Sequence, residues 1–166
     1  VHPEKTIVLG GVGAKAVEAL ILERFPEIDV IGYGEFERAG PVLLDALVHR
    51  KELSACPSIF YRDDGGVRRN PPCPRITDLD AIPYPAYEKI NLSRYEAVNV
   101  LTSRGCPFHC AFCSVAPIWD YKPYLRSAAS IIDELSWLQR HTNKDLFLFQ
   151  DEYFLANPER AIDFSR

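Results

Sequence analysis

Short apolar runs alternate with amphipathic stretches in the first fifty residues. Residues 6–9 and 30–31 are apolar, rich in β-branched side chains and followed by glycine, which is typical of buried strands. Residues 14–25 carry apolar side chains at helical spacing up to Pro26, and a second helix is expected to open with Pro41 in its first turn. This order of strand, helix, strand and helix favours a parallel, doubly wound sheet.

The pattern changes between residues 54 and 97, where prolines are frequent. Residues 58–61 and 67–69 flank Asp63-Asp64-Gly65-Gly66, a combination that predicts a hairpin. The prolines from Pro71 to Pro85 then favour an extended backbone. We interpret this stretch as a connector between two domains.

Alternation of strand and helix resumes at residue 98. Residues 98–102 predict a strand, and Ser127 is a suitable N-cap for a helix that runs to about His141. Residues 145–150 predict the next strand, and Asn157-Pro158 the start of another helix. Parallel strands joined by helices in this way are typical of α/β barrels, whose chemistry lies at the carboxyl ends of the strands.

Composition and charge exclude some classes of function. The apolar fraction of 47% supports a packed core, and the net charge of −4 argues against a nucleic-acid partner. No apolar run approaches the roughly 18 residues of a membrane span. No charged-then-apolar leader opens the sequence, so a cytoplasmic location is expected. Because the chain begins with Val1 and stops inside a predicted helix, we expect both ends to be cut.

The most specific chemistry lies in Arg104-Gly105-Cys106-Pro107-Phe108-His109-Cys110-Ala111-Phe112-Cys113, a C-x3-C-x2-C loop. Three thiolates at this spacing can hold one face of a [4Fe–4S] cluster and leave one iron without a protein ligand. Fully ligated clusters usually take four cysteines, and open metal positions are where chemistry occurs.

A non-catalytic alternative uses the same cysteines. In it, Cys106, Cys110 and Cys113 belong to a structural or interaction domain that binds zinc or a cluster, with His109 or Cys73 as the fourth ligand. His109 is adjacent to Cys110, which makes joint ligation awkward, and Cys73 lies in the proline-rich stretch. A disulfide is disfavoured because the chain has five cysteines, an odd count.

The cysteine loop resembles the signature of the radical SAM enzymes. The resemblance implies that Cys106, Cys110 and Cys113 bind the cluster and that S-adenosylmethionine (SAM) binds the fourth iron. It also implies that Phe112, just before the last cysteine, lies near the adenine. The implied reaction is reductive cleavage of SAM to a 5′-deoxyadenosyl radical, with an external electron donor such as flavodoxin or ferredoxin and a small-molecule substrate.

The first half of the chain resembles the cobalamin-binding subgroup of that superfamily, through Gly10-Gly11, the segment Asp29–Glu35 and the hairpin. The resemblance implies the end of a flavodoxin-like (Rossmann-type) domain in residues 1–53. A hairpin and proline-rich connector follow in 54–97, and the first strands and helices of a partial TIM-type barrel in 98–166. Cobalamin is the further cofactor implied, at Gly10 and Gly11, with methyl transfer or cyclisation as the reaction. The 166 residues alone are expected to be inactive.

Lesser features leave alternatives open. Gly11-Val12-Gly13-Ala14-Lys15-Ala16 fits a loose dinucleotide fingerprint, although glycines at a strand–helix turn more often serve backbone geometry. Asp151 and Glu152 follow the second barrel strand and either contact the SAM amino group or form a solvated loop or a helix cap. Trp119 and Tyr121 either shape the cofactor loop or serve packing.

Overall fold

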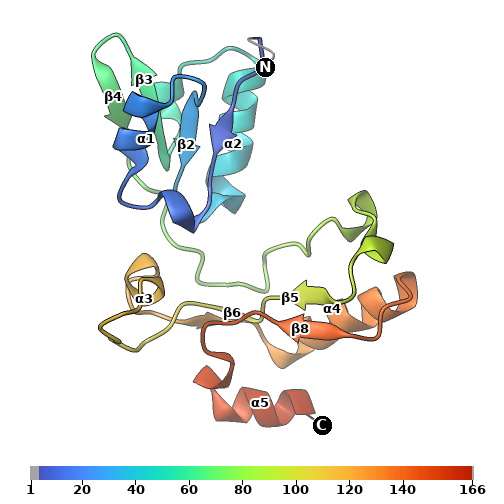
Figure 1. The fold of residues 1–166 in the computed structure, drawn as a ribbon. Coiled ribbons are helices and arrows are strands. Elements are labelled where there is room, and N and C mark those ends of the chain that lie inside the picture. The colour runs from blue at the N-terminus through green and yellow to red at the C-terminus, as the bar shows by residue number, and fades with distance from the viewer. Residues whose placement is uncertain (1–3, 166) are drawn as a thin grey trace. The chain divides into compact units, whose positions relative to one another are not determined.

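The structure is a computed structural model that describes residues 4–165. It confirms a mixed α/β protein (Figure 1). The chain divides into two compact units, residues 1–76 and 77–166, and each is described separately below. None of the helices in the described residues is both long enough and apolar enough to cross a membrane.

The first unit is built on a four-stranded sheet in the order β1-β2-β3-β4. β1 and β2 are parallel, whereas β3 pairs antiparallel with β2 and with β4. The expected parallel arrangement therefore holds for the first pair of strands only. The elements are β1 (Val8–Leu9), a 3-10 turn (Val12–Ala14), α1 (Glu18–Arg24), β2 (Val30–Gly32), α2 (Phe36–Val48), a 3-10 turn (Leu53–Ala55), β3 (Ile59–Asp63) and β4 (Gly66–Arg69).

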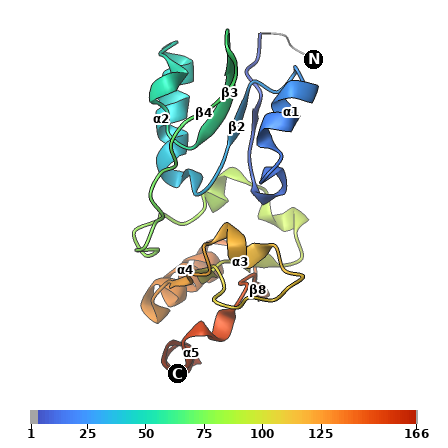
Figure 2. The same cartoon turned by 90° about the vertical axis from the view of Figure 1, so that its left-hand side faces the viewer.

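Helices cover both faces of this sheet, with α1 on one side and α2 on the other (Figure 2). Successive residues of β2 point to opposite faces, as the period of a strand requires. Val30 joins a buried cluster with Leu43 and Ala46 of α2, and Ile31 joins a second cluster with Leu22 of α1. Each face of the sheet thus has its own apolar core.

The predicted start of the second helix is wrong. α2 begins at Phe36, so Pro41 lies inside the helix and not in its first turn. An interior proline removes one backbone hydrogen bond and costs about 3 kcal/mol. The helix continues because its next turns bury Leu43 and Ala46, which are 1% and 4% exposed, and burial of such side chains outweighs the lost bond.

The predicted hairpin is confirmed. β3 and β4 pair antiparallel around the expected turn, where Asp63 Oδ1 accepts a hydrogen bond of 2.8 Å from the Gly65 amide. The hairpin continues the sheet of the first unit, because β3 is hydrogen-bonded to β2. The domain boundaries expected at residues 53 and 97 stay a prediction.

The second unit contains two short sheets. β5 and β8 form a parallel pair, as expected for strands joined through helices, and β6 pairs antiparallel with β7. The elements are 3-10 turns (Tyr87–Lys89 and Leu92–Arg94), β5 (Val98–Val100), β6 (Ser103–Arg104), α3 (Val115–Ile118), β7 (Tyr124–Leu125), α4 (Ala128–His141), β8 (Phe147–Phe149), a 3-10 turn (Phe154–Ala156) and α5 (Pro158–Ser165).

The start and end of α4 agree with the prediction from the sequence. Its N-cap is Ser127, whose hydroxyl accepts a hydrogen bond of 3.1 Å from the Ser130 amide, and its last residue is His141. Leu138 on this helix packs with Val98 and Val100 of β5 to form the apolar core of the unit. α4 therefore fixes the strand that leads into the cysteine loop.

A buried charged group also lies in this core. Glu134 of α4 is 1% exposed, forms an ion pair with Arg126 and accepts a hydrogen bond of 2.7 Å from the Tyr87 hydroxyl. Burial, with the Glu134 hydrogen bond and charge adding to it, raises the pKa of Tyr87 above its usual value, so the phenol stays protonated and donates. Arg126 also donates to the Leu101 carbonyl at 3.0 Å, which ties the ion pair to the end of β5.

We predict that Glu134→Gln destabilises the protein by about 3–5 kcal/mol, because Arg126, whose side chain is only 11% exposed, loses its ion-pair partner. The free energy of unfolding from urea titration measures the loss. Asp133→Asn is the matched control, since it removes the same charge one residue away at an exposed position and should change stability by less than about 0.5 kcal/mol. Equal losses in the two variants would contradict the assignment.

Candidate functional site

The cysteine loop is closed at its base by the β6–β7 ladder. Ser103 pairs with Leu125 and Arg104 with Tyr124, so residues 105–123 form one loop that leaves and re-enters the fold at the same place. This base lies two residues after the end of β5. The predicted site therefore begins at the carboxyl end of a parallel strand.

Gly105 opens the loop, and only glycine fits there. Its φ of +99° lies in the left-handed region, and a Cβ at this position would lie 2.6 Å from the Lys122 carbonyl oxygen. The backbones of the two loop ends therefore approach each other more closely than any side chain would allow. This contact fixes where Cys106 leaves the fold.

The three loop cysteines are free thiols. Cys106 and Cys113 are half-buried and Cys110 is exposed. The Cys113 amide donates to the Cys110 carbonyl at 3.0 Å, which makes a turn between them, and Phe112 at its tip is 93% exposed. Among residues 4–165, no three His, Cys, Asp or Glu side chains are gathered closely enough to hold one metal ion.

Asp151 follows β8 and reaches the end of β5. Its Oδ1 accepts hydrogen bonds from the Thr102 amide and hydroxyl, both at 3.0 Å, and from the Ser103 hydroxyl at 2.5 Å. Its Oδ2 is buried and has no hydrogen-bond partner among residues 4–165. One oxygen of this carboxylate thus fixes the chain before the cysteines, while the other keeps its capacity to accept a hydrogen bond.

Glu152 reaches the cysteine loop itself. Its Oε2 accepts from the Gly105 amide at 3.2 Å, and its Oε1 accepts from the Trp119 indole N–H at 3.1 Å. The structure thus brings both predicted carboxylates to the base of the loop, as expected from strands that end at one edge. Both oxygens of Glu152 are engaged by the protein.

The sequence did not predict a role for Arg160 of α5, because nothing in the pattern of this helical segment distinguishes the arginine as functional. Its side chain is buried and donates to the Thr102 carbonyl at 2.9 Å, to the Thr102 hydroxyl at 3.1 Å and to the Phe154 carbonyl at 2.7 Å. Desolvation lowers the pKa of Arg160, and the charge of Asp151 opposes that shift. A cation and an anion therefore converge on Thr102.

Aromatic side chains pack along the loop. His109 stacks on Tyr121 with ring centroids 3.9 Å apart and planes 10° from parallel, and Phe108 meets Tyr153 edge-on at 5.1 Å. Asp120 and Tyr121 both have left-handed backbones, with φ of 50° and 55°. Non-glycine residues in this region cost about 1–3 kcal/mol each, so the surrounding contacts must hold them there.

Gly10 and Gly11 lie after β1 in the first unit and are exposed. Gly11 has a φ of +94° with open space around it. A dinucleotide-binding fingerprint requires a glycine-rich turn that leads directly into a helix. Here a 3-10 turn follows Gly11, and α1 begins only at Glu18, so the dinucleotide alternative loses its structural basis.

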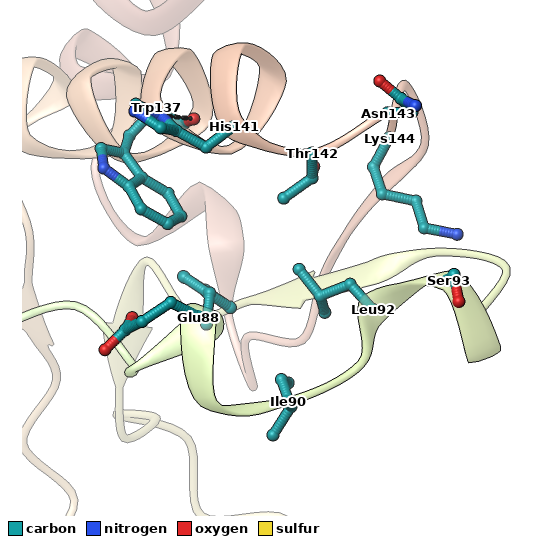
Figure 3. A pocket seen from close by; sticks show the side chains of 10 residues that line it. Glu88, Ile90, Leu92, Ser93, Trp137, His141, Thr142, Asn143 and Lys144 are labelled. Atoms are coloured by element: carbon teal, nitrogen blue, oxygen red, sulfur yellow. Dashed lines mark hydrogen bonds between the residues drawn. The ribbon is translucent and has the colours of Figure 1, made fainter.

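A separate pocket of about 590 Å³ lies under the end of α4 (Figure 3). Trp137 and His141 stack on its helical side with ring centroids 4.5 Å apart, and opposite them lie Ile90, which follows the first 3-10 turn, and Leu92, which begins the second. Its lining residues precede β5 and β8 in the sequence, whereas the cysteines and carboxylates follow these strands. None of the predicted site residues lines it.

Related proteins span almost the whole chain. An uncharacterized methyltransferase of Pyrococcus horikoshii is 35% identical over 96% of this chain and 36% of its own length. An anaerobic magnesium-protoporphyrin IX monomethyl ester cyclase of Synechocystis is 32% identical over 90% of this chain and 31% of its own length. The chain thus spans about a third of the length of these relatives. No protein-family model matches the chain.

Solved structures share the fold. The radical SAM methyltransferase TsrM of Kitasatospora setae, with cobalamin and a [4Fe–4S] cluster bound, aligns with a TM-score of 0.72 at 19% identity over 97% of this chain and 33% of its own. The cobalamin-dependent radical enzyme OxsB, with aqua-cobalamin and SAM bound, aligns with a TM-score of 0.76 at 22% identity over 95% of this chain and 23% of its own. By their names, the two solved proteins that share this fold are radical SAM enzymes with cobalamin bound, and the two relatives are a methyltransferase and a cyclase.

We predict that Asp151→Ala speeds hydrogen exchange of the Thr102 amide by roughly ten- to a hundredfold. A hydrogen bond to a charged group is worth about 1.5–3 kcal/mol, and the variant removes the acceptor of this amide. Exchange resolved by NMR or mass spectrometry measures the change. Asp145→Ala, an exposed aspartate before β8, is the control. Unchanged exchange in Asp151→Ala would show that Asp151 does not hold the end of β5.

Proposed function

We propose that this chain forms the cluster-binding part of a radical SAM, cobalamin-dependent enzyme, because it shares the fold of two such enzymes and its relatives are a methyltransferase and a cyclase by name. One observation carries the proposal: three free thiols lie on a single loop whose base is fixed at the carboxyl end of a parallel strand. The donor set fits a [4Fe–4S] cluster, because soft thiolates are its usual ligands and three of them leave one iron open.

In this proposal Cys106, Cys110 and Cys113 would hold the cluster as thiolates and leave one iron open for SAM. A bound cluster would supply the single electron, received from a reduced flavodoxin or ferredoxin, for cleavage of SAM to methionine and a 5′-deoxyadenosyl radical, which would act on a small-molecule substrate. The protein orients these groups and excludes water from them.

Residues near the loop are suited to hold SAM. Asp151 keeps one buried oxygen that receives no hydrogen bond from the part of the chain that the structure describes, which suits an ammonium group. Phe112 offers an exposed ring to the adenine. Glu152 is the second candidate for the SAM amino group, although both of its oxygens serve the loop in this structure.

The finer architecture is also part of the proposal. The sheet of the first unit, covered by helices on both faces, is the end of a flavodoxin-like domain, and the parallel β5–β8 pair begins a TIM-type barrel. Gly10 and Gly11, exposed after β1, would face cobalamin. With cobalamin bound, the expected reaction is methyl transfer to the substrate radical or a cyclisation, the reaction types that the relatives' names describe.

We predict that the full-length protein, reconstituted with iron and sulfide without oxygen, binds about four irons per chain and forms 5′-deoxyadenosine from SAM and a reductant. Cys113→Ala should lose both properties, since the cluster would keep only two thiolates. Cys73→Ala should keep both, because this cysteine lies outside the loop. Iron analysis and chromatography of the SAM products are the measurements.

Three outcomes would contradict this proposal, and two of them would favour the non-catalytic alternative. Stoichiometric zinc with no uptake of iron would favour a structural zinc domain. A Cys113→Ala variant with the full iron content would show that the cluster ligands are other residues. Iron uptake without cleavage of SAM would indicate a structural cluster.

A further inference from the structure

The segment Trp119–Lys122, here called the brace, lies between α3 and β7 and follows an unusual path. Asp120 and Tyr121 have consecutive left-handed backbones. The Tyr121 amide donates to the Ala116 carbonyl at 2.9 Å, and the Lys122 amide donates to the Trp119 carbonyl at 3.0 Å. The surrounding structure therefore holds the brace in one conformation.

The brace contacts residues 104–113, the cysteine-bearing part of the same loop, at two points, each next to a cysteine. At the first, Glu152 links the Trp119 indole N–H to the Gly105 amide, and the Lys122 carbonyl lies against Gly105, which precedes Cys106. At the second, the Tyr121 ring stacks on His109, which precedes Cys110. The same short segment thus fixes the backbone ahead of two of the three thiols.

We propose that Tyr121 is a positioning residue for the cluster loop, and that it acts through His109. This inference rests on the proposed function, because Tyr121 can position cluster ligands only if the thiols of the loop bind a cluster. Within residues 4–165, no hydrogen bond or ring contact joins Tyr121 to a cysteine. Its ring instead restricts His109, in the segment from which Cys110 projects. The left-handed backbone and the ring stacking occur at the same residue, and the stacked His109 helps to hold the Tyr121 ring in place.

The first arm of the test uses the iron-free full-length protein, so that it does not depend on the cluster. Tyr121→Ala removes the stacked ring and should speed exchange of the Cys113 amide, which is bonded to the Cys110 carbonyl, by about three- to tenfold. Tyr121→Phe keeps the ring and should exchange as the wild type does. The thermal unfolding midpoint should be the same for the two variants, because Tyr121 is 37% exposed and lies outside the apolar cores.

The second arm uses the reconstituted protein. The rate at which an iron chelator bleaches the cluster absorbance should rise about three- to tenfold in Tyr121→Ala and stay unchanged in Tyr121→Phe. Such rescue by the ring alone distinguishes positioning from a general loss of stability.

The outcomes separate this inference from the proposed function. Equal amide exchange in the alanine and phenylalanine variants would overturn the positioning role whether or not iron binds. Equal rates of cluster loss in the two variants would overturn it as well. Failure of the wild-type protein to take up iron would overturn the proposed function, and the first arm would still decide whether Tyr121 holds the loop.

Discussion

One buried polar residue, Thr102, carries the constraint on which the cysteine loop depends. Its amide and hydroxyl donate to Asp151, and its carbonyl accepts from the Arg126 amide and from the Arg160 guanidinium. Thr102 is fully buried, so each of these groups needs a partner inside the protein. Because Asp151 follows β8 and Arg160 belongs to α5, these hydrogen bonds join the strand before the cysteines to the next βα unit.

The charges around Thr102 also stabilise one another. Burial of an ion is unfavourable unless it is paired or hydrogen-bonded, and this unit buries Glu134 and Arg160 almost completely. Glu134 is paired with Arg126, whose backbone carbonyl accepts from Arg160. The helix α4, the end of β5 and the helix α5 are thereby linked by polar contacts in addition to the apolar core. A network of this kind specifies one arrangement, since a shifted strand would leave buried charges without partners.

The sequence predicted elements well where one local signal dominated. Ser127 marked the start of α4 because capping is local, and Asp63–Gly66 marked a hairpin because the turn chemistry is local. It failed at Pro41, where burial of the helix outweighed a local preference, and it did not predict that β3 would pair antiparallel with β2. The sequence predicted that the carboxylates and the cysteines would lie at one edge. It did not predict the role of Arg160, because the long-range partners of a helical arginine leave no periodic signal.

The cysteine loop combines a fixed base with an exposed tip. Ser103 and Gly105 are buried, whereas Cys110 and Phe112 are exposed, and the three thiols are not gathered in the protein alone. In the function proposed above, metal–thiolate bonds would be strong enough to order the tip when a cluster binds. The base contains none of the three cysteines, so such bonds would not order it directly. The protein must therefore hold the base through its own contacts, and Asp151, Glu152 and the brace provide these contacts.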